Sequence, residues 1–310
     1  MRLGGLETSD TVPLGVIPDV FAAIDPATVD WSRVSRGEFV IHQRITYRYA
    51  GPVHRLRQRL VVQPRETHGD QRRLSRRVHV VDAEPRSIRG RLDDFGNHVL
   101  EIDIPYVAEQ VSFISSSVVE RSVDTLHIQA GALLRDRRLL EPTGLTTPDR
   151  ALLDLAADLR TTGLQGQGLA AAVCMRVHEL MRYEHDVTGV RTTAAEAFAL
   201  GAGVCQDYAH IMLAVTRALG LASRYVSGQL LGVGGSHAWV EVLLPDGHGN
   251  ALVLSLDPTH GRATDLTYLT IALGRDYAHV APVSGTYAAS HHGHLTIAKR
   301  VAVMRVDEAA

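Results

Sequence analysis

The chain has 310 residues, of which 45% are hydrophobic and 21% charged, a composition typical of a globular protein long enough for two domains. Its net charge of −2 gives no basis for binding nucleic acid, and no apolar run approaches the ~18 residues of a membrane span. The two cysteines exclude a disulfide framework. Because residues 1–18 also lack a secretory signal pattern, we expect a cytoplasmic protein.

The first part of the chain has the pattern of a β-domain. Residues 1–36 are weakly patterned, and we treat them as an N-terminal extension with no assigned role. Short runs with a period of two then follow one another, separated by turn residues, which predicts an all-β, sandwich-like domain over residues 37–140. Arginine is dense from Arg55 to Arg91. The alternation of these arginines favours a solvated strand face over a surface for an anionic partner.

Three helices are expected next. A linker over residues 139–147 leads into a second domain, 141–310, whose first helix should start at Thr147-Pro148, with threonine as the N-cap. A second helix over about residues 168–183 carries Cys174, whose apolar neighbours predict a buried structural thiol. The pattern Thr193-x-x-Glu196 is a capping box and starts the third helix.

A fourth helix begins at Cys205 and is followed by strands. Apolar residues recur at three- and four-residue steps after Cys205, and Gly220 ends the pattern. Strands are expected at residues 224–231, 238–244 and 251–256. Helices followed by antiparallel strands predict an α+β domain with the cysteine helix packed on a sheet. We expect the last segment, residues 265–306, to extend that sheet.

Cys205 lies at the predicted helix N-terminus, where unpaired N–H groups favour a thiolate. That effect contributes at most about 2 kcal/mol, whereas an imidazolium about 4 Å away contributes roughly 4 kcal/mol. A nucleophilic Cys205 therefore needs a histidine partner, which in turn needs an orienting carboxylate. His237 and Asp257 are the candidates, since one starts a predicted strand and the other ends the next strand.

These residues stand in motifs that resemble the bacterial transglutaminase-like superfamily. The motifs are Gly203-Val-Cys-Gln-Asp-Tyr-Ala-His210, Arg224-Tyr-Val-Ser-Gly228, His237-Ala-Trp-Val-Glu-Val242 and Leu256-Asp-Pro-Thr259. Cys205 and His237 are 32 residues apart, and His237 and Asp257 are 20 apart, whereas papain-like proteases place the histidine much further downstream. The resemblance runs from about Phe39 to Val306. It implies a transglutaminase-core catalytic domain, with helices packed on an antiparallel sheet as in papain-like folds, behind a β-rich N-terminal region.

The resemblance also implies an activity. Cys205, His237 and Asp257 would form a catalytic triad that transfers an acyl group from an amide in a protein or peptide through a thioester. The acceptor would be an amine, as in a transglutaminase, or water, as in a cysteine peptidase or amidase, and a non-catalytic binding module is a further alternative. Gln206, Tyr208 and Trp239 are candidate cleft residues, although Trp239 is equally compatible with the core.

No cofactor or metal is expected. The chain shows no acidic Ca²⁺ loop, so the calcium dependence of the animal transglutaminases is not implied. The run His291-His-Gly-His294 is more typical of a solvated hairpin turn than of a metal site. Two departures from the family pattern bear on cleft shape and acceptor preference. Leu252-Val-Leu254 stands where relatives usually have a tryptophan, and His260 stands where an asparagine commonly follows Asp-Pro-Thr.

Overall fold

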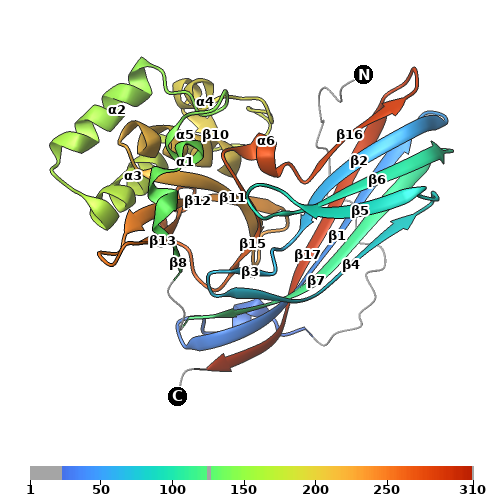
Figure 1. Cartoon of the computed structure of the whole chain (residues 1–310), viewed down its shortest axis with the longest axis horizontal. Coiled ribbons are helices and arrows are strands. Elements are labelled where there is room, and N and C mark those ends of the chain that lie inside the picture. The colour runs from blue at the N-terminus through green and yellow to red at the C-terminus, as the bar shows by residue number, and fades with distance from the viewer. Residues whose placement is uncertain (1–22, 124–126, 309–310) are drawn as a thin grey trace.

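The computed structural model describes residues 23–123 and 127–308. Most of the expected N-terminal extension, residues 1–36, therefore lies outside the described residues. Its described part holds a short 3-10 helix, η1 (Pro26–Thr28), and an isolated bridge between Ile24 and Val303. The long strands and the helices occupy opposite ends of the molecule (Figure 1).

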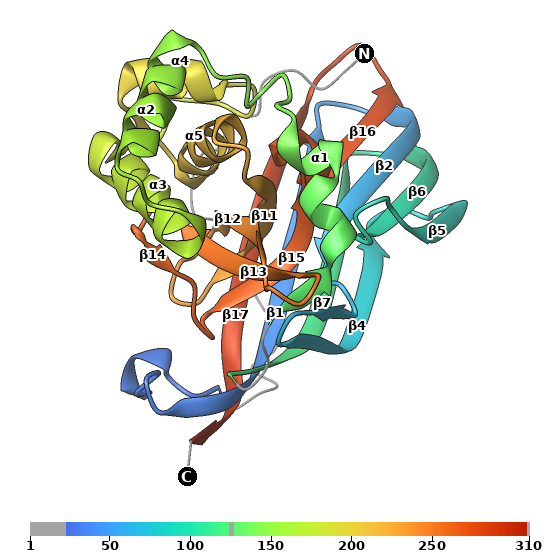
Figure 2. The same cartoon turned by 60° about the vertical axis from the view of Figure 1, so that its left-hand side comes forward.

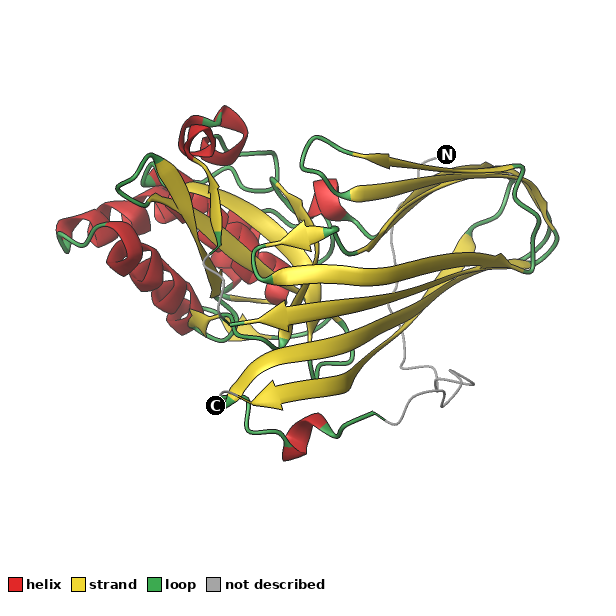
Figure 3. Cartoon of the chain, turned by 60° about the horizontal axis from the view of Figure 1, so that its bottom comes forward, coloured by secondary structure: helices red, strands yellow, loops and turns green. Residues whose placement is uncertain are grey.

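Two antiparallel sheets form the sandwich expected for the first part of the chain, which confirms that prediction (Figure 3). The first sheet has the order β17-β1-β7-β4-β3, with bounds Gly293–Glu308, Val34–Tyr49, Gln110–Ser122, Gln71–Val81 and Thr67–His68. The second has the order β16-β2-β6-β5, with bounds Val283–Ala288, Val53–Gln63, His98–Val107 and Ser87–Leu92. Alternate side chains of these strands point inward, so Ile45, Tyr47, Leu56, Ile104 and Phe113 are buried together between the sheets.

The expected domain boundaries need one correction. The prediction that residues 265–306 extend the catalytic sheet is right for β15 (Tyr268–Gly274) and wrong for the two strands after it. Strand β16 pairs with β2, and β17 pairs with β1 along nearly its whole length. The C-terminal strands thus return to the sandwich (Figure 2), so the sandwich contains both ends of the described chain.

The sheet of the second domain, which we call the catalytic sheet after the role that the sequence predicts for this domain, has the order β14-β13-β12-β11-β15, and β8 pairs with β13. Its strands are β8 (Ile128–Ala130), β11 (Ala222–Leu230), β12 (Ser236–Pro245), β13 (Asn250–Asp257) and β14 (Arg262–Ala263). A separate parallel pair joins β9 (Arg182–Tyr183) to β10 (Ala202–Gly203). Because β8 pairs with β13, the second domain begins before residue 141, where the sequence placed the boundary.

Helices lie on both sides of this sheet: those after residue 141 lie on one side, and the two short ones before it pack on the other, where Leu133, Leu134 and Leu139 cluster with Leu243 and Val253. They are α1 (Arg137–Leu140), α2 (Arg150–Thr161), α3 (Gly166–Leu180), α4 (Ala194–Leu200), α5 (Cys205–Ala218) and α6 (Tyr277–Val280), with a 3-10 helix η2 (Gly131–Arg135) before them. The capping box of Thr193 and Glu196 is present at α4. The expected cap at Thr147 is wrong, because Asp149 accepts the N–H of Leu152 and caps α2.

Helix α5 lies at the centre of the helical layer, with α2, α3 and α4 around it (Figure 2). Twelve of its residues are buried, so apolar and polar positions alike are shielded from solvent there. The core is continuous with the sandwich, because Phe39, Val99 and Val303 belong to the same buried cluster as Met212 and Val240. The cysteine helix is therefore held on both sides, which fixes the position of its first turn.

Side chains of the sandwich close the outer edge of β15. The Gln71 amide accepts the N–H of Thr270 and donates to its carbonyl, both at 2.8 Å. The Asn97 amide does the same with Leu273, at 2.8 and 2.6 Å. These four bonds satisfy backbone groups at the open edge of the sheet, and they fix the catalytic sheet to the sandwich. Within the described ranges, none of the helices has the length and apolar character needed to cross a membrane.

Candidate active site

Cys205 is the first residue of α5, as the sequence predicts. Asp207 holds this helix start, since its carboxylate accepts the N–H of Val204 at 2.8 Å and the hydroxyl of Thr188 at 2.6 Å. A Cβ on Gly203 would lie 2.5 Å from that carboxylate, so only glycine fits at this position. The sulfur is half-buried and lies 4.0 Å from the carbonyl oxygen of Ser236, the residue before His237.

His237 and Asp257 come from neighbouring strands of the catalytic sheet. Val240 of β12 pairs with Leu256 of β13, which puts His237 near the start of one strand and Asp257 at the end of the other, on the same face. Nε2 of His237 lies 2.7 Å from Oδ2 of Asp257, and both side chains are buried. The structure therefore brings Cys205, His237 and Asp257 together.

Asp257 accepts three side-chain hydrogen bonds on one oxygen. Besides His237, Nδ1 of His260 lies 2.6 Å from Oδ2 and the hydroxyl of Tyr268 lies 2.8 Å from it. The other oxygen accepts the N–H of Thr259. Although burial opposes it, these bonds lower the pKa of Asp257 well below its usual range. An ionised Asp257 accepts a hydrogen bond from each of its partners, so Nε2 of His237 is the protonated nitrogen and Nδ1 is left for the sulfur.

The electrostatics favour a charged imidazole at His237. Burial by itself lowers the pKa of His237, but hydrogen bonds to Asp257 and Cys205 outweigh it and raise the pKa to about 9. A positive imidazolium in contact with the sulfur stabilises a thiolate at neutral pH. Cys205 at the start of a helix and His237 at the start of a strand thus form the thiolate–imidazolium pair that a thiol nucleophile needs, and Asp257 at the end of the next strand supports it.

Two further polar groups lie close enough to Cys205 for its charge to act on them. The Tyr183 hydroxyl is one; burial and the charges of Cys205 and Tyr208 raise its pKa to about 12. The Lys299 ammonium, from β17 of the sandwich, is the other. Burial lowers the pKa of Lys299 to about 8, and the Cys205 charge offsets part of that effect. A charged group of the C-terminal strand therefore lies within electrostatic range of the sulfur.

The candidate cleft residues lie beneath the surface. Tyr208 and Trp239 are 2% and 1% exposed, and the Gln206 amide lies 3.4 Å from the carbonyl of Gly189. Trp239 stacks on His237 with ring centroids 6.3 Å apart and meets Tyr268 edge to face at 5.4 Å. This burial fits packing that supports the histidine, and it does not fit side chains that line an open cleft.

Sequence reasoning missed two residues that bind Asp257 and one charged residue nearby. Tyr268 starts a strand and gives no local signal of a polar role. His260 stands out in the sequence only as a departure from Asp-Pro-Thr-Asn, and that departure is the one available clue to its bond with Asp257. Lys299 lies in a strand that the sequence assigns to the wrong sheet. His237, Asp257 and His260 also lie close enough to share a cation, but an ion there would take Nε2 of His237 and Oδ2 of Asp257 out of the hydrogen bond that orients the imidazole.

Two family models match the chain. The model of the transglutaminase-like superfamily matches residues 154–251, which include Cys205 and His237 but end before Asp257. The model of the bacterial transglutaminase-like N-terminal region matches residues 39–120, within the sandwich. The fold and the matched motifs define a transglutaminase-like protein with a bacterial N-terminal β-region.

Relatives agree with this assignment. An uncharacterised protein of Mycobacterium leprae is 30% identical over 231 residues, which cover 68% of this chain and 80% of the relative. The chain belongs to the transglutaminase-like superfamily. An uncharacterised protein of Mycobacterium tuberculosis is 33% identical over 149 residues, which cover 44% of this chain and 43% of the relative, so the match spans less than half of that protein.

A solved structure has the same fold. A candidate cysteine protease of Cytophaga hutchinsonii superposes with a TM-score of 0.71 over 89% of this chain and 94% of its own, at 20% identity. The similarity covers sandwich and catalytic domain together. At this identity it shows that the two proteins share a fold.

Proposed function

We propose that the protein is a thiol acyl-transfer enzyme that acts on an amide of a protein or peptide through a thioester. The observation that carries this proposal is the contact of His237 with both Asp257 and Cys205, at the first residue of a helix. Membership of the transglutaminase-like superfamily agrees with a protein or peptide as the acyl donor.

The proposed first step forms the thioester. The Cys205 thiolate attacks the amide carbonyl carbon, and the negative charge moves to the carbonyl oxygen. Collapse of this intermediate breaks the C–N bond, and His237 donates its Nδ1 proton to the leaving amine. The backbone N–H of Cys205 has no intrahelical partner at the first position of α5, so it is available to stabilise the oxyanion.

The second step removes the acyl group from Cys205. Neutral His237 accepts a proton from the acceptor, which attacks the thioester carbon, and the thiolate leaves. Asp257 keeps Nε2 protonated and stabilises the imidazolium in both steps. A primary amine as acceptor gives a new amide, whereas water gives a carboxylic acid. We keep hydrolysis as the second candidate, since nothing in the triad distinguishes the two acceptors.

Incubation with a glutamine-containing peptide, with and without a fluorescent primary amine, tests the proposal. Ammonia release together with amine incorporation supports transfer, and ammonia release or peptide cleavage alone supports hydrolysis. Cys205→Ala should abolish either activity, while Asp257→Asn should lower kcat by about 10²–10⁴-fold because the imidazole loses its orienting charge. A chain that shows no turnover on a panel of such peptides, and whose Cys205 reacts with iodoacetamide no faster in the wild type than in His237→Ala, would instead be a binding module.

We also propose the cytoplasm as the compartment of this reaction. Both cysteines are free in the structure, and Cys205 has to stay reduced to act as a nucleophile.

A further inference from the structure

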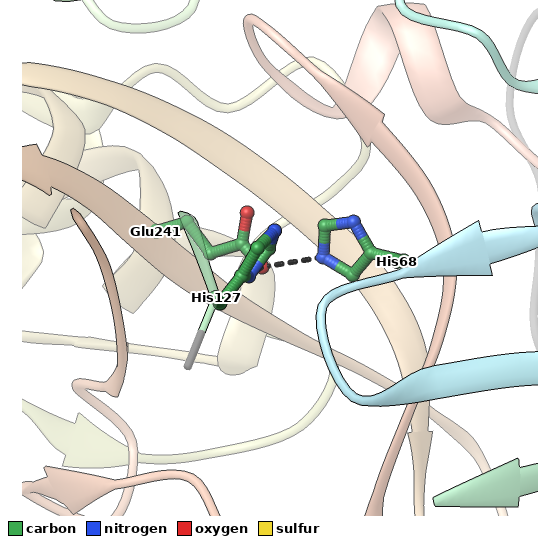
Figure 4. A group of neighbouring side chains, drawn as sticks. All are labelled: His68, His127 and Glu241. Atoms are coloured by element: carbon green, nitrogen blue, oxygen red, sulfur yellow. Dashed lines mark hydrogen bonds and ion pairs between the residues drawn. The ribbon is translucent and has the colours of Figure 1, made fainter. Parts of the chain in front are cut away.

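A second group of ionisable side chains lies where the sandwich meets the catalytic sheet. His68 comes from β3, His127 from the segment before β8, and Glu241 from β12 (Figure 4). Nε2 of His68 lies 2.6 Å from Oε1 of Glu241, and Nδ1 of His127 lies 4.0 Å from the same oxygen. Glu241 is four residues beyond His237 on the same strand, about 13 Å away, so the proposed acyl transfer does not use this group.

The three side chains are enclosed. His68 and Glu241 are 7% and 1% exposed, and the His127 side chain is 13% exposed. The two imidazole rings meet edge to face with centroids 4.5 Å apart. Gly69, at φ +57°, makes room for this contact, because a Cβ there would lie 2.9 Å from the His127 ring. The turn after β3 is therefore shaped to let His127 approach His68.

The donor set of this group suits a metal ion. It holds two imidazoles and one carboxylate, which come from three separate segments of the chain. Two neutral imidazoles and one carboxylate are the donors that zinc takes in sites that keep an open fourth position.

Of the two carboxylate oxygens of Glu241, Oε1 is the one that an ion would bind. It accepts hydrogen bonds from Nε2 of His68 and from the Ser255 hydroxyl, at 2.6 and 3.4 Å, which a bound ion would replace. Arg224 donates to Oε2 of Glu241 at 2.7 Å, so Oε1 is the atom that faces the two rings.

The Gln129 amide lies 3.1 Å from Nε2 of His127. The atom at this distance is the amide nitrogen, which donates to Nε2. Rotation of the amide by 180° would place its oxygen there, to accept the Nε2 proton and leave Nδ1 free, as metal-binding histidines require.

We propose that His68, His127 and Glu241 bind a zinc ion with water as the fourth ligand, and that this ion links the sandwich to the catalytic domain. The three donor atoms all lie within 4.8 Å of one another. A tetrahedral ion about 2.1 Å from each donor holds them about 3.4 Å apart. Binding therefore requires Nε2 of His68 to withdraw from Oε1 by less than about 1 Å and His127 to approach by a similar amount. It also requires Nε2 of His68 to lose the proton that it shares with Oε1, either to Nδ1 of the same ring or to solvent.

Metal titration of the full chain tests this site. The parent for the test is Cys205→Ala, His260→Ala, because His237, Asp257 and His260 form a second group that could bind the same ion. We expect the metal-stripped parent to bind one equivalent of Co²⁺ with the visible absorption of a four-coordinate ion, and Zn²⁺ to displace it. Because Zn²⁺ binds only the folded state, it should also raise the Tm of the parent.

Variants of the proposed ligands, compared with one control variant, show whether this group binds the ion. In the same parent, His127→Gln should weaken Zn²⁺ and Co²⁺ binding by at least about 100-fold and abolish the Tm rise. His248→Gln, an exposed histidine of the β12–β13 turn, should change neither. Circular dichroism and the metal-free Tm identify any variant that fails to fold, and His68→Gln then serves as the second test. Absence of one-equivalent binding by the parent, or binding that survives both His127→Gln and His68→Gln, would overturn the proposal.

Discussion

The hydroxyl of Tyr268 donates a 2.8 Å hydrogen bond to Oδ2 of Asp257, the oxygen that also binds His237. Tyr268 starts β15, whose outer edge is held by the sandwich, so the orientation of this carboxylate depends on both domains. Each donor on Oδ2 withdraws part of the negative charge that stabilises the imidazolium. Removing one of these donors should therefore strengthen the interaction of the Asp257 carboxylate with the His237 imidazolium.

Tyr268→Phe should raise the pKa of His237 and lower stability. The variant keeps the ring that packs on Trp239 and loses only the bond to Asp257, which as a bond to a charged group is worth about 1.5–3 kcal/mol of stability. We expect the alkaline limb of kcat/KM to move to higher pH, while activity at pH 7 falls by less than about tenfold. A pH–rate profile checks this, and an alkaline limb at lower pH than in the wild type would contradict it.

His260 should act on the same carboxylate from its exposed side. Its Nδ1 lies 2.6 Å from Oδ2 of Asp257, and its side chain is 42% exposed, so solvent can replace part of the bond. We expect His260→Ala to lower kcat/KM by up to about tenfold and His260→Asn to recover most of that loss, because an asparagine amide can donate to the same oxygen. If His260→Asn is as impaired as His260→Ala, the imidazole itself is needed.

The raised pKa of His237 links stability to pH. Because the pKa is about 9 in the folded state and ~6.5 in an unfolded chain, the charged imidazole stabilises the fold fully below about pH 6.5, and this stabilisation is lost as pH rises through 9. The pair with Asp257 should account for on the order of 2–3 kcal/mol of this change. Urea unfolding at pH 6.5 and 9.5 measures it.

His237→Ala is the control for that measurement. Its stability should change less between pH 6.5 and 9.5 than that of the wild type, whatever the overall cost of the substitution. The pH dependence of activity should report the titration of His237 as well, with kcat/KM falling above about pH 9 as the imidazolium loses its proton. Equal pH dependence of unfolding in both proteins would show that His237 has an ordinary pKa.

The order of local elements could be predicted from the sequence, and the pairing of distant ones could not. The hairpin of β12 and β13 follows from alternation and a short turn, so His237 and Asp257 could be expected to meet. The partner of β17 is β1, which lies near the other end of the chain, and alternation says nothing about which sheet a strand joins. Lys299 was missed for that reason, since it comes near the site only through the place of β17 in the sandwich. The sheet of β15 was predicted correctly, and Tyr268 was missed because an aromatic residue at the start of a strand gives no local signal of a polar role.

Asn97 should be important for the contact between the domains. It is fully buried, and its amide holds both backbone groups of Leu273. Asn97→Ala leaves a buried N–H and a buried carbonyl without partners, which should cost about 2–4 kcal/mol of unfolding free energy. Urea denaturation checks this against Gln167→Ala, an exposed helical position that should change stability by less than about 0.5 kcal/mol. A similar small loss for both variants would mean that water replaces the Asn97 bonds.

Gly228 should be indispensable for the packing under His237. A Cβ there would lie 2.3 Å from the carbonyl oxygen of Leu269 and 2.3 Å from the Trp239 ring, and neither the β11–β15 pairing nor the buried indole can move without disturbing the other. Because His237 stacks on Trp239, Gly228→Ala should lower kcat as well as stability, the latter by about 1–3 kcal/mol or more. Gly144→Ala is the matched control, since nothing lies within 4 Å of a Cβ at that position. Thermal unfolding and kcat measured on both variants decide the matter, and a Gly228→Ala enzyme with wild-type kcat would show that the indole can shift without displacing the imidazole.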